Sequence, residues 1–184
     1  FTSNAYETEK IIKKAKANDL MIVEAMSHRF IPNSIEIKKL IGELGDIKIV
    51  SLNYSQYSSR YDKFKEGIIE PVFSLENSGG ALIDLNLYNV AFAVDVFGLP
   101  KDVRYFANIE KDIDTSGIVI LDYGDFKVSS VGSKDSAAPI INTIQGTDGT
   151  IEIPDALNSF REFNIRKTKE DDKKYFNYNL GDKS

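Results

Sequence analysis

The chain has 184 residues, of which 42% are hydrophobic and 28% are charged, and its formal net charge is −5. These values are typical of a globular protein that buries its own core, whereas a nucleic-acid-binding protein would carry a basic patch. The chain lacks cysteine, has one histidine (His28), and shows neither an export leader nor an apolar run of roughly 20 residues, so we expect a cytoplasmic protein without disulfides, a metal site or a membrane span.

The N-terminal part of the chain predicts a helix, a strand and a second helix. Residues 3–18 form the first helix, with Asn4 as its cap and Glu7 as the capping-box partner. The apolar run LMIVEAM at 20–26 is typical of a short buried strand. Residues 31–45 carry an apolar stripe at helical spacing and end on a glycine, which predicts the second helix.

Residues 46–58 alternate between polar and apolar side chains and predict a long strand, whose polar side would line a cleft or an interface. A loop at 58–78 follows, and loops of this length in compact domains are commonly functional. The stretch SGGALIDLNLYNVAFAVDVFG at 78–98 predicts a helix that ends at Gly98, with Pro100 just beyond it.

From Lys101 onward the pattern is that of strands separated by turn residues such as Gly124-Asp125. The predicted strands lie at 102–110, 116–123, 126–133, 138–146 and 149–154. Strands joined by such short turns pair antiparallel. We therefore predict an α+β fold: a single domain over residues 1–184 with an open, mainly antiparallel sheet, helices packed on one face, and a solvated charged tail at 166–184.

Motifs for phosphate binding and for nucleophilic catalysis are absent from the sequence. It has no Gly-x-Gly, so it contains neither a dinucleotide fingerprint nor a P-loop. It also lacks a Gly-x-Ser-x-Gly elbow, and one histidine leaves little scope for a Ser/His/Asp triad. We expect no cofactor-binding residues in this chain.

Two polar residues interrupt the most apolar helix of the sequence. Asp84 and Tyr88 are four residues apart, so on an α-helix they share one face. A carboxylate and a phenol on one face can both meet a substrate hydroxyl. The alternative is a core helix in which the apolar side chains pack inward while Asp84 caps the helix or faces water.

Four motifs occur in a fixed order between Leu20 and Pro154: VEAMSHRFIP, LGDIKIVSLNYS, GGALIDLNLYNV with DVFGLPKDV, and IQGTDGTIEIP. In this order they resemble the C-terminal domain of the glucose–fructose oxidoreductase/inositol dehydrogenase/MocA (Gfo/Idh/MocA) family. Members of that family are NAD(P)-dependent enzymes that act on sugars, polyols and related hydroxy compounds. The block Gly-Gly-x-x-x-Asp-x-x-x-Tyr is the most specific of these motifs.

The resemblance implies a longer parent protein with an N-terminal Rossmann domain, which binds NAD or NADP and ends in a Glu-Lys-Pro motif with an active-site lysine. The opening FTSNAYETEK resembles the segment that follows this motif in the family. The chain would then be a substrate-binding and oligomerisation domain without its cofactor half. By itself it should be inactive, whereas the parent should transfer a hydride to or from a sugar, a polyol or a cyclic diol.

The resemblance also implies roles for the helix pair. Hydride transfer from an alcohol carbon needs a base for the hydroxyl proton. A free phenol, with a pKa of ~10, is a poor base near neutral pH, but a nearby ammonium lowers that value. Tyr88 would therefore act as acid/base together with the family's lysine, and Asp84 would bind the substrate hydroxyl or orient its neighbours. Tyrosine at this position resembles the glucose–fructose oxidoreductase-like and dihydrodiol dehydrogenase-like members.

Further substrate contacts are expected from Arg29 and from the loop. Arg29 matches an Arg-Phe-x-x-Pro segment of the family and would contact substrate or nicotinamide; equally, it could pair with an acidic neighbour at a helix entry. For the adjacent His28 we expect a structural or surface role. Arg60, Tyr61 and Lys63 could reach the substrate from the loop, or could belong to a mobile, solvated segment.

The strand-rich half indicates an oligomer. Ile118 and Ile120 alternate with Val119 and Leu121, so both faces of this strand are apolar. In the family the open sheet face forms the dimer interface, and we expect a homo-oligomer. Two alternatives stay open: a non-catalytic small-molecule-binding or dimerisation module with the same fold, and an unrelated α+β domain whose motif matches are accidental.

Overall fold

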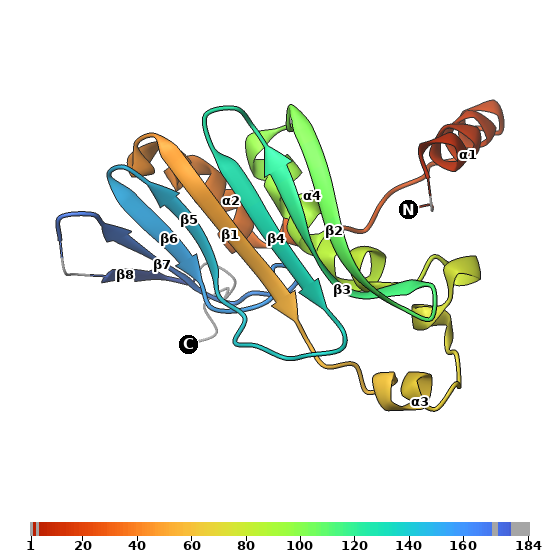
Figure 1. Ribbon diagram of the computed structural model, residues 1–184. Coiled ribbons are helices and arrows are strands. Elements are labelled where there is room, and N and C mark those ends of the chain that lie inside the picture. Colours follow the sequence, from red (N-terminus) through yellow and green to blue (C-terminus); the bar gives the residue numbers. More distant parts are fainter. Residues whose placement is uncertain (1, 3, 171–172, 178–184) are drawn as a thin grey trace, which may run out of the picture.

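The computed structural model describes residues 2, 4–170 and 173–177, and its centre is one sheet of eight strands (Figure 1). Their order across the sheet is β2-β3-β4-β1-β5-β6-β7-β8. The central pair β1–β4 is parallel, and the other neighbouring pairs are antiparallel, which confirms the predicted open, mainly antiparallel sheet. The strands span Ile47–Ser55 (β1), Asp102–Glu110 (β2), Ile113–Asp122 (β3), Lys127–Ser133 (β4), Asn142–Gly146 (β5), Gly149–Ile153 (β6), Phe163–Lys167 (β7) and Lys173–Phe176 (β8).

Two helices, α2 and α4, cover one face of the sheet, whereas α1 stands apart from it (Figure 1). The α-helices span Ala5–Ala17 (α1), Pro32–Leu40 (α2), Tyr61–Lys65 (α3) and Leu87–Phe97 (α4). Short 3₁₀ turns lie at Ser27–Phe30, Ile41–Leu44, Pro71–Phe73 and Leu75–Asn77, and a π-helical turn lies at Leu82–Asn86. The predicted cap of α1 is present, because the Asn4 side chain accepts a hydrogen bond from the Glu7 amide.

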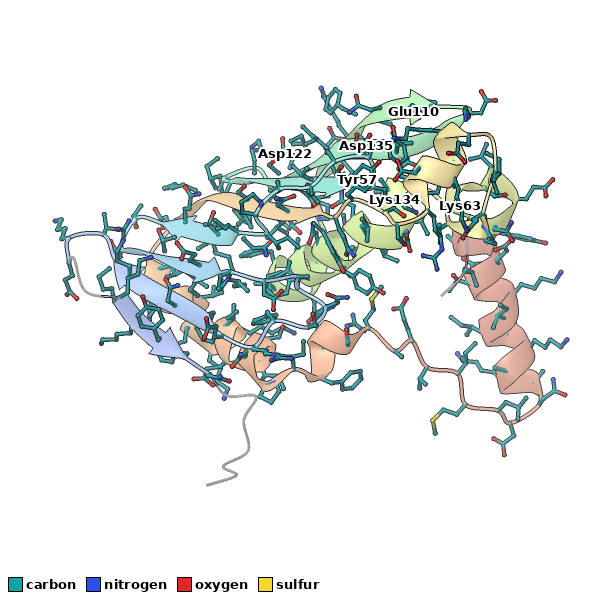
Figure 2. All side chains as sticks on the ribbon, turned by 90° about the horizontal axis from the view of Figure 1, so that it is seen from below. Tyr57, Lys63, Glu110, Asp122, Lys134 and Asp135 are labelled. Carbon is teal, nitrogen blue, oxygen red and sulfur yellow. The ribbon has the colours of Figure 1, made fainter. Side chains whose placement is uncertain are left out.

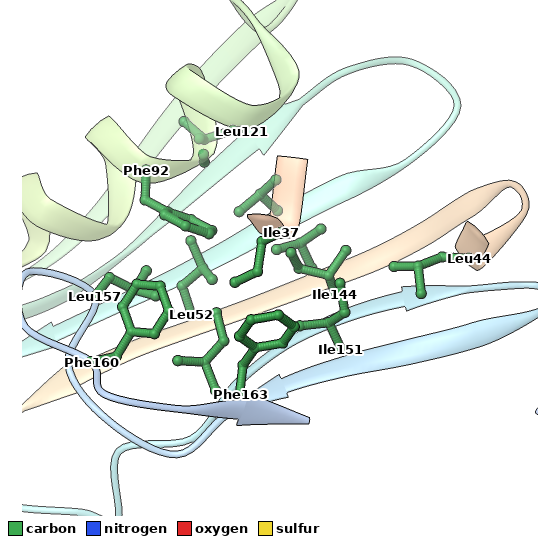
Figure 3. Packing of buried hydrophobic residues seen from close by; sticks show 14 of the residues in the cluster. Ile37, Leu44, Leu52, Phe92, Leu121, Ile144, Ile151, Leu157, Phe160 and Phe163 are labelled. Atoms are coloured by element: carbon green, nitrogen blue, oxygen red, sulfur yellow. The ribbon is translucent and has the colours of Figure 1, made fainter. Parts of the chain in front are cut away.

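The main core lies between this helical layer and the sheet (Figure 3). Phe92 of α4 and Ile37 of α2 are fully buried and belong to the same cluster as Leu52 of β1. Phe160 and Phe163 extend the cluster toward β7. Burial of each such side chain contributes ~1.5–3 kcal/mol, so this core fixes α4, and the turn that precedes it, on the sheet.

Residues 20–26 form no strand, so that prediction is wrong. The segment is extended, yet it pairs with no strand of the described sheet, and its apolar side chains are exposed, Met21 to 91%. Met26, at its end, is buried. The apolar run produced the strand signal, but a buried strand needs a surface to cover it, and the described part of the chain provides none here.

The predicted loop at 58–78, hereafter segment 58–78, is folded and has a small core of its own. Phe64 and Phe73 stack with their ring centroids 4.6 Å apart, and Tyr61 packs against both rings. Ile113 at the start of β3 completes this aromatic cluster. The prediction of a loop is thus corrected: the segment consists of short helical turns that aromatic packing holds together.

The end of β7 and all of β8 lie in the region predicted as a solvated tail at 166–184, so the prediction is wrong for these strands. Phe163 and Phe176 stack with their ring centroids 5.0 Å apart and join the main core. Lys173 and Lys174 precede Phe176, and this charge run concealed the alternation of β8. The last part of the proposed tail, 178–184, lies outside the described residues.

The stretch Leu75–Phe97 is long and apolar enough to cross a membrane by length and composition alone, which differs from the expectation that no such run exists. Its inward face carries Asn86, Asn89 and Phe92, all of them buried. Both asparagines donate hydrogen bonds to backbone carbonyls of β4. One face of this stretch therefore packs on the sheet.

Candidate functional site

The π-helical turn Leu82–Asn86 leads into α4 and carries Asp84. Two features fix the start of this turn. Gly80 adopts a φ of +105°, in the region that favours glycine, and so redirects the chain into the helix. The carboxylate of Asp114 on β3 accepts a hydrogen bond from the Leu82 amide (2.7 Å), which places a negative charge at the positive end of the helix dipole.

A buried polar network holds the other side of the turn against β4. Asn86 donates to the Ser130 carbonyl (3.0 Å) and accepts from the Ser130 hydroxyl (2.5 Å). Asn89 in turn donates to the Asn86 side chain (3.2 Å). Gly132 on β4 permits the close approach, since a Cβ at that position would lie 2.6 Å from the Cβ of Asn86. The turn that carries Asp84 is thereby pinned to the sheet.

The Asp84 carboxylate forms an ion pair with a buried lysine. Lys134 Nζ lies 2.8 Å from Asp84 Oδ2, although the Lys134 side chain is only 1% exposed while that of Asp84 is 41% exposed. The same ammonium donates to the Val72 carbonyl (2.5 Å) and lies 4.3 Å from the centroid of the Phe73 ring. Figure 2 shows Lys134 at the end of the sheet where segment 58–78 packs. A buried ammonium needs such partners, because desolvation penalises an unpaired charge.

Tyr54 and Tyr88 approach each other from a strand and a helix. Tyr54 lies near the end of β1, and its ring centroid is 6.2 Å from that of Tyr88. Burial raises the pKa of the Tyr54 hydroxyl; a hydrogen bond with the Asn158 side chain opposes this rise, and the nearby Tyr88 and Asp84 add to it. Tyr54 is therefore protonated at neutral pH and can donate a hydrogen bond to a ligand.

Asp84 and Tyr88 line two adjoining cavities that share Ile83. The cavity at Tyr88 has a volume of about 350 Å³ and is lined by Val23, Glu24, Ala25, Met26, Ile83, Leu87 and Tyr88. The cavity at Asp84 has a volume of about 180 Å³ and is lined by Pro71, Val72, Asn77, Ser78, Gly79, Ile83 and Asp84. The hydrogen bonds of a π turn span one residue more than those of an α turn, so side chains four residues apart no longer stack on one face. The structure therefore brings the two residues to neighbouring cavities instead of a single pocket.

Arg29 is held near the C-terminal end of α4. Its Nε lies 3.5 Å from Asp95 Oδ1, and Lys38 Nζ lies 2.6 Å from Asp95 Oδ2. His28 is fully buried with its Nε2 3.8 Å from the same carboxylate, and burial lowers the pKa of the imidazole, so His28 is neutral. This is the geometry of the alternative considered for Arg29, an arginine paired with an acidic neighbour at a helix entry.

The three candidates in segment 58–78 are engaged with other side chains. Arg60 and Lys63 both pair with Glu70, at 2.8 and 3.0 Å. The Tyr61 ring is buried in the aromatic cluster, and its hydroxyl donates to Glu110 (2.6 Å); this hydrogen bond raises the pKa of Tyr61 to about 12. Their connection with the site is indirect, because their segment also supplies the carbonyl and the ring that hold the buried lysine.

The turn at Gly79-Gly80 does not fit the phosphates of a dinucleotide. The adjacent glycines Gly79 and Gly80 come nearest to a phosphate-binding turn, but the protein's own atoms fill the space beside them. A Cβ at Gly79 would lie 2.7 Å from the Pro71 carbonyl oxygen, and a Cβ at Gly80 would lie 1.9 Å from Asp114 Oδ1, a negative charge that repels phosphate. Over the same described ranges, no three or more His, Cys, Asp or Glu side chains are grouped so as to hold a metal.

Two residues of this arrangement, Lys134 and Tyr54, were not predicted from the sequence. Tyr54 left a signal, since it continues the inward alternation of Val50 and Leu52 along β1 and so had to reach the helical layer. Lys134 left none, because it follows β4 as an ordinary loop lysine and is buried only by the packing of segment 58–78.

Comparisons with known proteins agree with this fold. A family model described as the GFO/IDH/MocA C-terminal domain matches residues 35–152. The scyllo-inositol 2-dehydrogenase (NADP(+)) IolU of Bacillus subtilis is 42% identical over 156 residues, which cover 83% of this chain and 47% of that protein. The uncharacterized oxidoreductase YgjR of Escherichia coli is 34% identical over 152 residues, covering 82% of this chain and 46% of that protein.

A solved structure is similar over nearly the whole chain. It is an inositol dehydrogenase homolog from Azotobacter vinelandii, complexed with NADH and myo-inositol, with a TM-score of 0.75 at 13% identity. The match covers 96% of this chain and 47% of that one, and at this identity it shows the fold. The chain spans about half the length of the curated relatives that it matches.

Proposed function

The chain belongs to the GFO/IDH/MocA family of oxidoreductases, and on that premise we propose that it is the substrate-binding domain of an NAD(P)-dependent oxidoreductase that acts on a cyclic polyol. The family match confirms the resemblance that the four motifs indicated. Support for the substrate class comes from the 42% identity with a scyllo-inositol dehydrogenase and from the site itself. Asp84 and Tyr88 bring a carboxylate and a phenol to adjoining cavities, and the Tyr54 ring lies beside that of Tyr88; carboxylates and phenols bind neutral hydroxyls.

The proposed chemistry assigns only proton handling to this chain. Oxidation of a secondary alcohol releases a hydride and a hydroxyl proton, and we assign the binding of the hydride acceptor to the rest of the parent. Tyr88 would accept the hydroxyl proton as the phenolate, which the lysine expected in the parent would stabilise, and would return the proton in the reverse direction. Asp84 would accept a hydrogen bond from a neighbouring hydroxyl, while protonated Tyr54 would donate one. By itself the chain is then expected to bind substrate without turnover.

We further propose that α1 and the extended residues 20–26 pack against the remainder of a longer parent. The apolar side chains exposed along 20–26, with Met21 at 91%, need a covering surface that the described residues do not provide. Amide hydrogen exchange across 20–26 should therefore be slower in the full-length parent than in this chain. Equal exchange rates in the two would refute the packing.

The experiment that tests the proposed function is a steady-state assay of the full-length parent on scyllo-inositol, myo-inositol and a trans-cyclohexanediol, each with NAD and NADP. Tyr88→Phe should lower kcat by ~10²–10⁴-fold, the usual contribution of a positioned acid/base. Tyr123→Phe is the matched control, because the Tyr123 hydroxyl donates to the Gly98 carbonyl (2.9 Å) in another part of the fold. Full activity of Tyr88→Phe would refute the acid/base role, and a parent that binds the polyols without turning them over would favour the non-catalytic module.

We also propose a homo-oligomer that forms through the uncovered face of the sheet. Phe106 on β2 and Ile118 on β3 are paired neighbours there and are 61% and 42% exposed. Phe106→Asp with Ile118→Asp should shift the sedimentation coefficient toward that of a monomer. Ile35→Asp on α2, outside this face, is the control and should leave the coefficient unchanged. An unchanged oligomer in the double variant would refute the interface.

A further inference from the structure

Lys134 is a buried cation that the proposed acid/base chemistry does not use. Its side chain is 1% exposed, and its ammonium contacts the Asp84 carboxylate, the Val72 carbonyl and the face of the Phe73 ring. Each of these contacts compensates part of the desolvation of the charge. The lysine therefore joins three elements that are distant in sequence: the end of β4, the π-helical turn, and segment 58–78.

The backbone of Lys134 is anchored on both sides. Its amide donates to the Thr115 carbonyl (2.8 Å), and its carbonyl accepts from the Ser58 amide (2.8 Å). The next residue, Asp135, accepts hydrogen bonds from the hydroxyls of Thr115 and Ser116, at 2.8 Å each. The backbone is thus held at both of its polar groups, and the contacts with Asp84, Val72 and Phe73 hold the ammonium.

The two partners of the ion pair differ in exposure, and this difference indicates which partner can also contact a ligand. The ammonium is fully enclosed and contacts Oδ2 of Asp84, whereas the carboxylate is 41% exposed and lines the smaller cavity. Only one carboxylate oxygen is thus engaged with the lysine. A carboxylate has acceptor sites on both oxygens, so it can accept from a ligand while the lysine holds it.

We propose that Lys134 is a positioning residue: it fixes the orientation and the charge of Asp84 for hydrogen bonding to a substrate hydroxyl, and it couples that carboxylate to segment 58–78. The proposal rests on the proposed function of the site. It implies that a change in the packing of Val72 and Phe73 alters polyol affinity without any direct contact with the polyol. Lys134 itself touches no substrate.

The test is a double-mutant cycle on the full-length parent, with KM, kcat and Tm measured for Lys134→Met, Asp84→Asn and the double variant. Lys134→Met should raise the KM for the polyol ~10-fold or more, as expected when a charge-assisted hydrogen bond is lost. In the Asp84→Asn background the same substitution should change KM less than twofold, because a positioning residue acts through its partner. Lys134→Arg should recover part of the KM, since it retains the charge.

Lys127→Met is the matched control. The Lys127 ammonium also pairs with a carboxylate, that of Asp122 (2.9 Å), and donates to a backbone carbonyl, that of Gly124 (2.8 Å), but it lies at the β3–β4 hairpin and contacts no part of segment 58–78 in these interactions. Lys127→Met should leave the KM unchanged. Equal KM values for Lys127→Met and Lys134→Met, or additive effects in the cycle, would overturn the role of Lys134.

Two further outcomes separate this role from the proposed function. A wild-type parent that turns over no polyol overturns the proposed function and this role with it. Should Lys134→Met fail to fold, Lys134→Arg and the double variant, in which neither charge remains, still decide the question. A KM that equals the wild-type value in the double variant while Asp84→Asn alone raises it would also contradict the proposed coupling.

Discussion

Gly132→Ala tests whether the site depends on the close approach of the π-helical turn to β4. The added methyl group would lie 2.6 Å from Asn86 Cβ and 3.3 Å from the Ala81 carbonyl oxygen. Carbon atoms in contact are ~3.5–4.0 Å apart, so the turn must retreat by about 1 Å. Overpacking of this kind destabilises by ~1–3 kcal/mol, which for a chain of this length lowers Tm by about 2–12 °C.

The assay is thermal and urea unfolding of the 184-residue chain followed by circular dichroism. Gly42→Ala is the matched control, because a Cβ at Gly42 would meet nothing within 4 Å. We expect Gly42→Ala to be neutral or slightly stabilising, since alanine restricts the unfolded chain. If Gly132→Ala unfolds at the same temperature and urea concentration as Gly42→Ala, the turn does not depend on contact with β4, and the argument that pins Asp84 to the sheet fails.

Three further predictions follow from the same contacts. Asn86→Ala should lower the free energy of unfolding by ~1–3 kcal/mol in urea, because it leaves buried partners unpaired; exposed Asn77→Ala, as control, should not. Burial alone would raise the pKa of Asp135, but four hydroxyl hydrogen bonds together lower it, so its stabilisation is present above the ordinary pKa of ~4 and is lost as pH falls through the folded-state value. Asp135→Asn should therefore flatten the acid side of the stability–pH curve, and an unchanged curve would contradict this. Met21→Ser should change the stability of this chain by less than ~0.5 kcal/mol, whereas a larger loss would show that the 20–26 segment is packed here.

The elements predicted correctly are those with local signals. The Asn4 cap located α1, Gly45 located the end of the 3₁₀ turn Ile41–Leu44 that follows α2, and the Gly124-Asp125 turn located the hairpin of β3 and β4. In each case the determining residues lie within a few positions of the feature, so the sequence alone contains the information.

The wrong predictions concern features that depend on distant residues. The aromatic cluster of segment 58–78 needs Ile113 from β3, and β8 needs Phe163 from its neighbouring strand. Within the site, the helix that carries Asp84 and Tyr88 was recognised, but the π turn that separates their side chains was not. Lys134 was missed for the same reason, since its burial is a property of tertiary packing and has no pattern in the sequence.

The position of β1 has a consequence for how the chain folds. It is the first strand along the sequence but lies inside the sheet, where Ile49 pairs with Lys127 on one side and Gln145 on the other. The neighbouring strands β4 and β5 are synthesised after β1. Pairing between strands so far apart in sequence slows folding. During synthesis both edges of β1 would carry unpaired backbone N–H and C=O groups. Aggregation of the nascent chain would therefore begin at this strand.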